Sequence, residues 1–533
     1  MTTMKRTIYT SVSALALLAA APAFAQSNDS TVTQSGDSQT ASVTQSGAND
    51  VSFVTQENAD NDATVSQAGA TGSYSNVLQT GAGNTASVTQ DDDGTGVAPT
   101  QTSEVQQTGS DNDATVTQTQ TSSFLGTTND STVVQSGSSN VAAVSQADDG
   151  QFSSLYQTSD NNIANVSQGV DGAPEGGSAG TTYENTSYVT QGGTGGNDAT
   201  VTQSGYVNYS SVNQQGADSI ADVTQSGNLN TSDVSQLDDA GGTATVTQSG
   251  DSNDSTVNQT SNGSIATVDQ SGSGNLSVLN QGRNDGNPFQ TNGQQALITQ
   301  GGDNNQSYAT QSGSSGDLNV NQSGDNNLSD VVQSGFDNSA GDNTGMVGVN
   351  QEGNSNEAYV TQAGQLSDAM IDQIGDDNYA SIDQSVGNAP NPPGGPDPRV
   401  ATASISQDGS NNSSTIDQFG GSATISARLM EASSSQGGDN NQSTISQTNT
   451  LVAGASSGNF ASVDQGGNDN ISTVMQDGAL NEAMVDQSGN GNESWVSQAG
   501  SGHSATVTQS TDMNNSVVNQ TGMNNTATVT QGM

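Results

Sequence analysis

The sequence predicts an all-β protein, a β-solenoid of stacked β-arches (cross-β, amyloid-like) with about 20 two-strand coils of about 22 residues each. Three observations predict this fold. A Gln recurs at 40 positions from Gln34 to Gln531, and 28 of the 39 steps between neighbours are 11 residues long. The residue two before this Gln anchor is Val, Ile or Leu in 38 of the 40 copies. Glycine recurs two residues after the anchor, and every proline from Pro99 onward lies outside the repeated phrase.

Each repeat predicts one short strand and one tight turn. In the copy at 527–531, Val529 and Gln531 share one face, and Thr528 and Thr530 share the other. A period of two is typical of a strand. An 11-residue helical repeat is the alternative, but the Gly, Asn and Asp residues after each anchor favour turns. Identical units favour stacking like on like over a meander, which gives a rod of ~95 Å at the ~4.8 Å spacing of paired strands.

The inward face of each strand is expected to carry Ala or Ser, then Val or Ile, then Gln. Stacked Gln side chains can hydrogen-bond to the Gln above and below, so that their buried amides are satisfied. We therefore predict that the anchors and the apolar residues before them form a self-assembly ladder. The representative members are Gln34, Gln45, Gln56, Gln67, Gln351, Gln362, Gln373, Gln384, Gln487, Gln498, Gln509, Gln520, Gln531, Val507, Val518 and Val529.

The domain organisation follows from the ends of the repeat. Residues 1–25 have the order of a secretory signal peptide, with Lys5 and Arg6, an apolar run and a small-residue cleavage site between Ala25 and Gln26. Residues 26–533 form the repeat solenoid. Long insertions, expected to loop out of it, are near 91–104, 119–130, 169–185, 283–293, 336–346, 385–399, 419–433 and 448–458. If strands alternate sides strictly, the first three loops lie on one edge and the last five on the other.

The charge limits the possible partners. After cleavage the only basic residues are Arg283, Arg399 and Arg428, against 54 acids, so the formal net charge is 3 − 54 = −51. Such a surface repels nucleic acid and anionic membranes. No segment after the signal is apolar enough to cross a bilayer, and there is no Cys to form a disulfide. The prediction is an exported, extracellular or surface-attached chain that is not an integral membrane protein.

Catalysis is not predicted. The single His503 has no Cys or second His beside which it could act, and we expect it to be a solvated turn residue. The run Asp91-Asp92-Asp93-Gly94 has some likeness to a calcium loop but lacks spaced ligands, so loosely bound calcium is the alternative to no cofactor. Trp495 is expected on the outward face as a lone surface aromatic residue.

The spacing of Gln520, Gly522, Asn525, Ala527 and Gln531 resembles the curlin repeat of bacterial curli fibres. The run 351–384 looks especially like a curli subunit of the nucleator type, and the likeness extends over about residues 28–533. This resemblance implies a functional amyloid that polymerises at the cell surface and in the biofilm matrix. It also implies other curli-type subunits and an outer-membrane export pore as partners. Ordinary members have fewer repeats, without these long insertions.

Two classes of function remain open from the sequence. The first is a structural subunit or nucleator that assembles into extracellular fibres for the biofilm matrix and surface adhesion. The second is a monomeric surface β-solenoid that acts as an adhesin, with an ice-binding solenoid as a weaker variant because of outward Thr-x-Thr phrases. A monomer needs capped ends to prevent edge pairing. The last unit, 523–533, has the ordinary repeat sequence, so an open edge is expected there.

Overall fold

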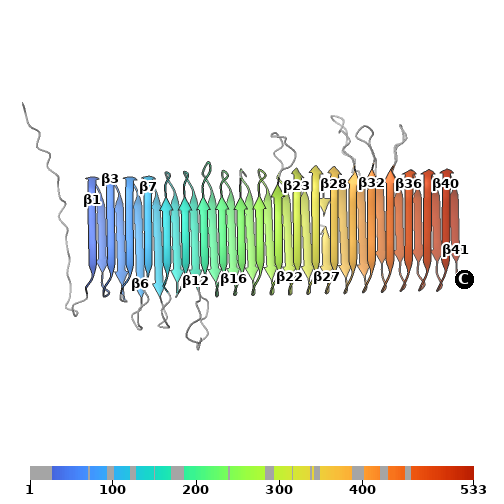
Figure 1. The fold of residues 1–533 in the computed structure, drawn as a ribbon, viewed down its shortest axis with the longest axis horizontal. Coiled ribbons are helices and arrows are strands. Elements are labelled where there is room, and N and C mark those ends of the chain that lie inside the picture. Colours follow the sequence, from blue (N-terminus) through green and yellow to red (C-terminus); the bar gives the residue numbers. More distant parts are fainter. Residues whose placement is uncertain are drawn as a thin grey trace, which may run out of the picture.

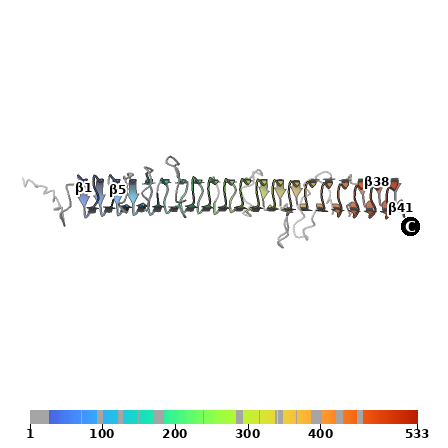
Figure 2. The same cartoon turned by 90° about the horizontal axis from the view of Figure 1, so that it is seen from below.

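The computed structural model describes residues 27–69, 72–92, 101–120, 128–148, 150–169, 185–237, 240–282, 293–314, 316–336, 339–340, 348–365, 367–386, 401–420, 430–449 and 458–532. These residues form a straight rod of two facing β-sheets, and successive strands alternate between the sheets (Figures 1 and 2). One strand from each sheet and the turn between them make a rung, and the rungs follow one another in chain order along the rod. None of the described residues forms a helix of the length and hydropathy that crossing a bilayer requires.

Sheet A has 20 strands. They are β1 (Asp29–Asp37), β3 (Val51–Ala59), β5 (Tyr74–Ala82), β7 (Thr102–Ser110), β9 (Asp130–Gln135), β11 (Phe152–Gln157), β13 (Thr186–Gln191), β15 (Tyr209–Gln214), β17 (Thr231–Gln236), β19 (Asp254–Gln259), β21 (Leu276–Gly282), β23 (Gln306–Ser314), β25 (Leu328–Phe336), β28 (Glu357–Gln365), β30 (Tyr379–Val386), β32 (Ser413–Gly420), β34 (Gln442–Asn449), β36 (Ile471–Ala479), β38 (Glu493–Ser501) and β40 (Asn515–Met523).

Sheet B is built in the same way. Its strands are β2 (Thr40–Gln45), β4 (Asp62–Ala68), β6 (Thr85–Asp92), β8 (Asp113–Gln120), β10 (Val141–Ala147), β12 (Ile163–Gly169), β14 (Asp198–Ser204), β16 (Ile220–Ser226), β18 (Thr243–Ser249), β20 (Ile265–Ser271), β22 (Gln295–Gly301), β24 (Asp317–Ser323), β26 (Ser339–Ala340), β27 (Val349–Glu352), β29 (Ser367–Ile374), β31 (Ala401–Asp408), β33 (Met430–Gln436), β35 (Phe460–Gln465), β37 (Glu482–Gln487), β39 (Ser504–Gln509) and β41 (Thr526–Gln531). The short β26 and β27 both pair with β24 and β29, so they are two pieces of one rung position.

Every pairing between neighbouring strands is parallel and in register. In sheet A, for example, Gln34 of β1 pairs with Gln56 of β3, and each later anchor pairs with the anchor of the next rung. Because the side-chain period of a strand is two, this register keeps the same side chains on the same face along the whole rod. The prediction of a β-solenoid with about 20 coils is confirmed.

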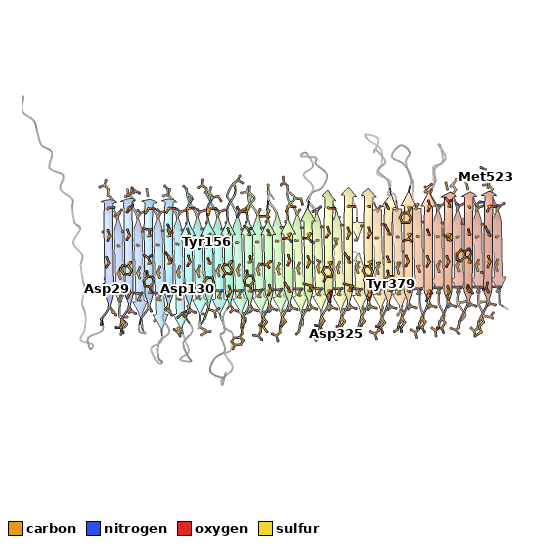
Figure 3. All side chains as sticks on the ribbon, in the orientation of Figure 1. Asp29, Asp130, Tyr156, Asp325, Tyr379 and Met523 are labelled. Carbon is orange, nitrogen blue, oxygen red and sulfur yellow. The ribbon has the colours of Figure 1, made fainter. Side chains whose placement is uncertain are left out.

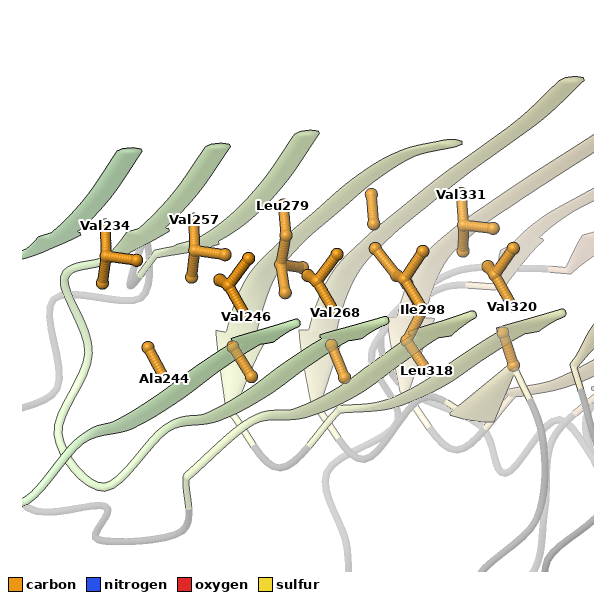
Figure 4. Close-up of a cluster of buried hydrophobic side chains, with 14 of the residues drawn as sticks. Val234, Ala244, Val246, Val257, Val268, Leu279, Ile298, Leu318, Val320 and Val331 are labelled. Atoms are coloured by element: carbon orange, nitrogen blue, oxygen red, sulfur yellow. The ribbon is translucent and has the colours of Figure 1, made fainter. Parts of the chain in front are cut away.

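The core is a narrow apolar spine between the sheets. The Val, Ile or Leu two before each anchor meets its counterpart from the other sheet, as Val246 and Val257 illustrate in Figure 4. In most rungs sheet B adds an Ala two residues earlier, such as Ala244, where sheet A has a Ser, such as Ser255. Both Ala244 and Ser255 are fully buried. A core this thin suits a composition with only 29% hydrophobic residues, because the backbone ladders and side-chain ladders share the stabilisation.

The turns from sheet B to sheet A stack as closely as the strands do. Gly250 has a φ of 103°, and a Cβ at this position would overlap the carbonyl oxygen of Gly272 in the next rung. A turn that needs both a left-handed conformation and close backbone approach requires glycine. Asn304, with a φ of 57°, supplies the second left-handed residue of such a turn.

Some of the insertions are shorter in the structure than the sequence predicts. Residues 102–104 and 430–433, expected in loops, belong to strands β7 and β33, because they continue the alternation of inward and outward residues that precedes the anchor. The strands before the first three insertions belong to sheet B and those after them to sheet A, and this order is reversed at the last five insertions. The prolines from Pro99 onward all fall outside the described residues.

Candidate functional site: glutamine ladders and the rod ends

The anchors form two continuous ladders, one in each sheet. Each Gln donates from its Nε2 to the Oε1 of the Gln in the next rung, at 2.7–3.0 Å. The sheet A ladder begins at Gln34 and ends at Gln520, and the sheet B ladder runs from Gln45 to Gln531. The ladders contain every Gln that the sequence singles out, including Gln56, Gln67, Gln351, Gln362, Gln373, Gln384, Gln487, Gln498 and Gln509. Val507 and Val518 are buried beside them, and Val529 packs against the same core.

From Gln45 onward, the second amide hydrogen of the anchor Gln connects the two sheets. Gln259 of β19 donates to the carbonyl oxygen of Thr243 in β18 at 3.0 Å, as well as to Gln281 at 2.9 Å. Its Oε1 accepts from Gln236 at 2.8 Å. The buried amide is therefore satisfied on both sides, which removes the penalty that an unpaired buried amide would carry.

A further ladder, made of Asn side chains, was not predicted from the sequence. The Asn residue immediately before many strands is buried, and its Oδ1 accepts the backbone N–H of the corresponding Asn in the next rung. Asn253, for example, donates its N–H to Asn230 at 3.0 Å and accepts the N–H of Asn275 at 3.1 Å. Its Nδ2 also donates to the carbonyl of Gly272 at 3.0 Å. Asn is common in turns for local reasons. Its recurrence six residues before the anchors is therefore explained by turns alone, and the sequence does not indicate that these side chains stack.

His503 occupies one position of this Asn column, and the expectation of a solvated turn residue is wrong. Its side chain is 1% exposed. Its Nδ1 accepts the backbone N–H of Asn525 at 3.3 Å, and its Nε2 lies 3.2 Å from the carbonyl oxygen of Ala499. The neutral imidazole with its hydrogen on Nε2 makes both bonds, whereas a protonated ring has no acceptor to offer Asn525.

Replacing His503 by Ala is expected to loosen the pairing of the last described strand, β41, with β39, because the backbone N–H of Asn525 loses its acceptor. The variant His503→Asn keeps an acceptor at this position, as Asn does elsewhere in the column, and should retain the pairing. Hydrogen exchange of the 525–531 amides measures the effect. Equal exchange in His503→Ala and the wild type would contradict this role.

Each glutamine ladder has a direction, because every Gln donates its amide hydrogen toward the following rung. The two ends of the described rod therefore differ. At the first rung, the Oε1 atoms of Gln34 and Gln45 have no donor among the described residues. At the last rung, Gln520 and Gln531 each donate one Nε2 hydrogen to a backbone carbonyl and keep the other. The backbone bonds run in both directions, since outward residues such as Ser504 donate N–H to the following rung, here to Asn525, whereas turn residues such as Asp60 donate to the preceding rung. The end formed by β40 and β41 therefore presents the groups that complement the end formed by β1 and β2.

Carboxylates stack along the outer faces. Asp383 of β30 and Asp417 of β32 pair in register on neighbouring strands. Partial burial raises the pKa of both carboxyl groups, and the charge of Asp383 raises that of Asp417 further. Asp464 of β35 shows the same effect of burial, with a further contribution from the charge of Asp486 in the next rung. In-register stacking places like charges side by side, which opposes the ionised form.

Acidification is expected to stabilise the rod and speed its assembly. An acid whose pKa is higher in the folded rod than in the unfolded chain binds more protons when folded, so stability falls as pH rises through the raised values. The stability that these carboxyl groups lose on ionisation is fully retained below the ordinary Asp pKa of 3.8. Free energies of unfolding and growth rates should therefore be larger at pH 4.5 than at pH 7, and divalent cations should act in the same direction by screening.

The variant Asp383→Asn/Asp417→Asn should reduce this pH dependence. The control Asp325→Asn/Asp376→Asn removes the same charge from exposed turns, where solvent screens it, and should leave more of the dependence in place (Asp325 is labelled in Figure 3). Growth and stability that do not change between pH 7 and pH 4.5 would show that the carboxylates do not oppose stacking.

In the described part of the chain, no group of three or more His, Cys, Asp or Glu side chains lies close enough to hold a metal ion. Asp91 and Asp92 lie at the end of β6, while Asp93 and Gly94 of the suggested calcium loop, and Ala25 and Gln26 of the cleavage site, fall outside the described residues. Trp495 lies on the outer face of sheet A and is 45% exposed.

The rungs and ladders define a class of protein: a parallel, in-register β-solenoid built from a two-strand repeat. The family model of the curlin associated repeat matches residues 196–227, 243–272, 324–364, 481–510 and 505–532. The chain thus contains curlin associated repeats over these residues. No match to a curated protein was found.

Proposed function

We propose that this chain is a secreted structural subunit or nucleator that assembles head to tail into extracellular amyloid-like fibres. The observation that carries the proposal is the polarity of the ladders. The end formed by β40 and β41 presents Nε2 hydrogens of Gln520 and Gln531, and the other end presents the Oε1 atoms of Gln34 and Gln45. A second copy stacked in the same direction continues both ladders, whereas a reversed copy brings like groups together.

The joint between copies would repeat the contacts inside each copy. Within the rod, a rung contributes two Gln–Gln bonds, two parallel strand pairings and two apolar contacts to its neighbour. The same set is available between the last rung of one copy and the first rung of the next. Unpaired edge strands readily accept a further strand, and stacking identical units explains why the rungs keep one register throughout.

Export and the matrix location complete the proposal. The signal-like segment at 1–25 supports secretion with cleavage between Ala25 and Gln26. By analogy with the family, the fibres would serve the biofilm matrix and surface adhesion. Other curli-type subunits and an outer-membrane pore would be partners. The ladder geometry involves no cofactor in this role.

Assembly by the chain from Gln26 to Met533 tests the proposal. We expect purified chain to form fibres that bind amyloid dyes and give the ~4.8 Å meridional reflection of stacked strands. Seeds of preformed fibres should shorten the lag phase. Chain that stays monomeric for days at high concentration, with or without seeds, would contradict the proposal and favour the monomeric adhesin.

A further inference from the structure

The two outer faces of the rod differ in their aromatic content. Among the described strands, eleven outward-facing aromatic side chains lie on sheet A and one, Phe460, lies on sheet B. We call the outer surface of sheet A the aromatic face. Its aromatic residues are Phe53, Tyr74, Phe152, Tyr156, Tyr188, Tyr209, Tyr308, Tyr359, Tyr379, Phe419 and Trp495. Figure 3 shows Tyr156 lying over the strands and Tyr379, the first residue of β30, near the edge at which that strand begins.

The densest part of the aromatic face covers three consecutive strands. The ring of Tyr188 on β13 lies 5.5 Å from that of Phe152 on β11 and 5.9 Å from that of Tyr209 on β15, with tilted ring planes. Tyr188 and Tyr209 are 41% and 37% exposed. The three rings therefore form a row along the rod axis whose surfaces remain open to solvent. Tyr156, also on β11, widens the row at one end.

Carboxylates bound this row at both ends. Asp130 of β9 pairs in register with Phe152, and Asp233 of β17 lies in the strand after Tyr209, in register with Ser211. Aromatic ring faces stack on the C–H face of a pyranose, and carboxylates accept hydrogen bonds from its hydroxyl groups. The aromatic rings and the carboxylates thus lie in one row along the rod, where a chain of sugars lying along the same axis could contact both.

The charge distribution selects among possible occupants. The described residues contain no Lys or Arg, and outward Asp and Glu residues such as Glu104, Asp130 and Asp233 recur along the strands of sheet A. A second copy laid face to face would oppose these carboxylates with its own and provide no cation to pair with them. Nucleic acid, anionic lipid and anionic polysaccharide meet the same repulsion. An uncharged polyhydroxylated chain meets none of it.

We propose that the aromatic face binds a neutral polysaccharide, with Phe152, Tyr188 and Tyr209 as the centre of the binding surface. The inference goes beyond fibre assembly and does not depend on it, because the face is present on a single rod as well as on a stacked one. In a fibre, repetition of the surface along the axis would add avidity.

Depletion onto microcrystalline cellulose, an uncharged β-linked glucan, tests the proposal with the chain from Gln26 to Met533 as soluble rod and as fibre. The variant Phe152→Thr/Tyr188→Thr/Tyr209→Thr introduces a residue that other rungs already carry at these outward positions. We expect it to weaken binding by at least about tenfold, because stacking on exposed rings is lost. The single change Tyr188→Phe keeps the ring and should retain most of the binding.

The matched control lies on the opposite sheet. Ile163, Ile220 and Ile265 are outward side chains of sheet B with exposures of 42–44%, and Ile163→Thr/Ile220→Thr/Ile265→Thr removes a comparable apolar area. This control should bind cellulose like wild type. Circular dichroism and resistance to protease verify that each variant is folded, and Tyr188→Thr alone replaces the triple variant if that does not fold.

Three outcomes would overturn the proposal. They are a wild-type chain that does not bind cellulose, an equal loss in the two triple variants, and an aromatic-dependent binding of polylysine without binding of cellulose, which would assign the face to a cationic partner. Fibre formation is followed in parallel by dye binding. Cellulose binding by a chain that never forms fibres would leave this inference standing and overturn the proposed function alone.

Discussion

Proline at two outward positions of the last described strands, Val517→Pro in β40 and Thr528→Pro in β41, is expected to stop fibre growth from that end. Outward residues donate their backbone N–H toward the following rung, as Ser504 does to Asn525. In the last rung these groups point to where the next copy would dock. Proline removes the donor and its ring obstructs the approaching strand, while the pairing with β38 and β39 uses the inward residues and is retained.

The variant should therefore fold as wild type does and act as a chain terminator. Added at a few per cent to wild-type monomer, it should reduce elongation from the end that β40 and β41 form, measured on individual seeded fibres. Val517→Ala/Thr528→Ala keeps both N–H groups and serves as the control, with near wild-type growth expected. Unimpaired elongation by the proline variant at both fibre ends would show that these strands do not form the joint.

Replacing the inward Gln259 by Leu is expected to destabilise the strands around it in the middle of the rod. The apolar side chain leaves the Nε2 of Gln236 and the Oε1 of Gln281 without their present partners. Leaving buried polar groups unsatisfied costs roughly 1–3 kcal/mol each, so that a total of about 3 kcal/mol and an increase of about a hundredfold in local amide exchange are expected. In a solenoid the damage stays near its origin, so β17 to β21 should exchange fastest.

The control for this change is Thr256→Val in the same strand. Thr256 faces outward, so the substitution leaves the ladder intact and should alter exchange in β17 to β21 by less than about threefold, the range of ordinary surface changes. Equal exchange in the Gln259→Leu variant and the wild type would mean that the glutamine ladder contributes little, and that the apolar spine and backbone pairing hold the rod together.

The sequence was sufficient to predict the solenoid, because one period determines both the strand and its partner. The Val and Gln columns alternate with polar residues every second position, and only in-register stacking buries them all, as Val246 and Gln248 of β18 show. Tight turns and the exclusion of proline agreed with the same register. Consistency between local and long-range signals of this kind makes a fold predictable.

Other features needed the three-dimensional register. Asn253 has the sequence signature of a turn residue, and only stacking reveals that its side chain caps the next rung and is buried. His503 is buried for the same reason, because it stands in the Asn column. The direction of the amide bonds from Gln34 onward depends on which atom faces the next rung, which no residue pattern encodes. The gathering of rings such as Tyr188 and Tyr209 on one face appears once alternate units are assigned to opposite sheets.

Head-to-tail continuation of the rungs between copies is tested most directly by a pair of engineered cysteines. The chain contains no Cys. Thr530 of β41 and Thr44 of β2 face outward at the same position of their strands. Stacking in register would place them on adjacent strands of two copies with their Cα atoms ~4.8 Å apart, within the Cα–Cα range that a disulfide spans. Within one chain they lie at opposite ends of the rod, as Figure 1 shows for β1 and β41.

Oxidised fibres of the Thr44→Cys/Thr530→Cys chain are predicted to yield a ladder of covalent oligomers on denaturing, non-reducing gels. Fibres of either single variant should yield only monomer. Dimers from Thr530→Cys alone would instead indicate ends that meet like to like, and fibres of the double variant that give no crosslink would contradict a joint that continues the rungs.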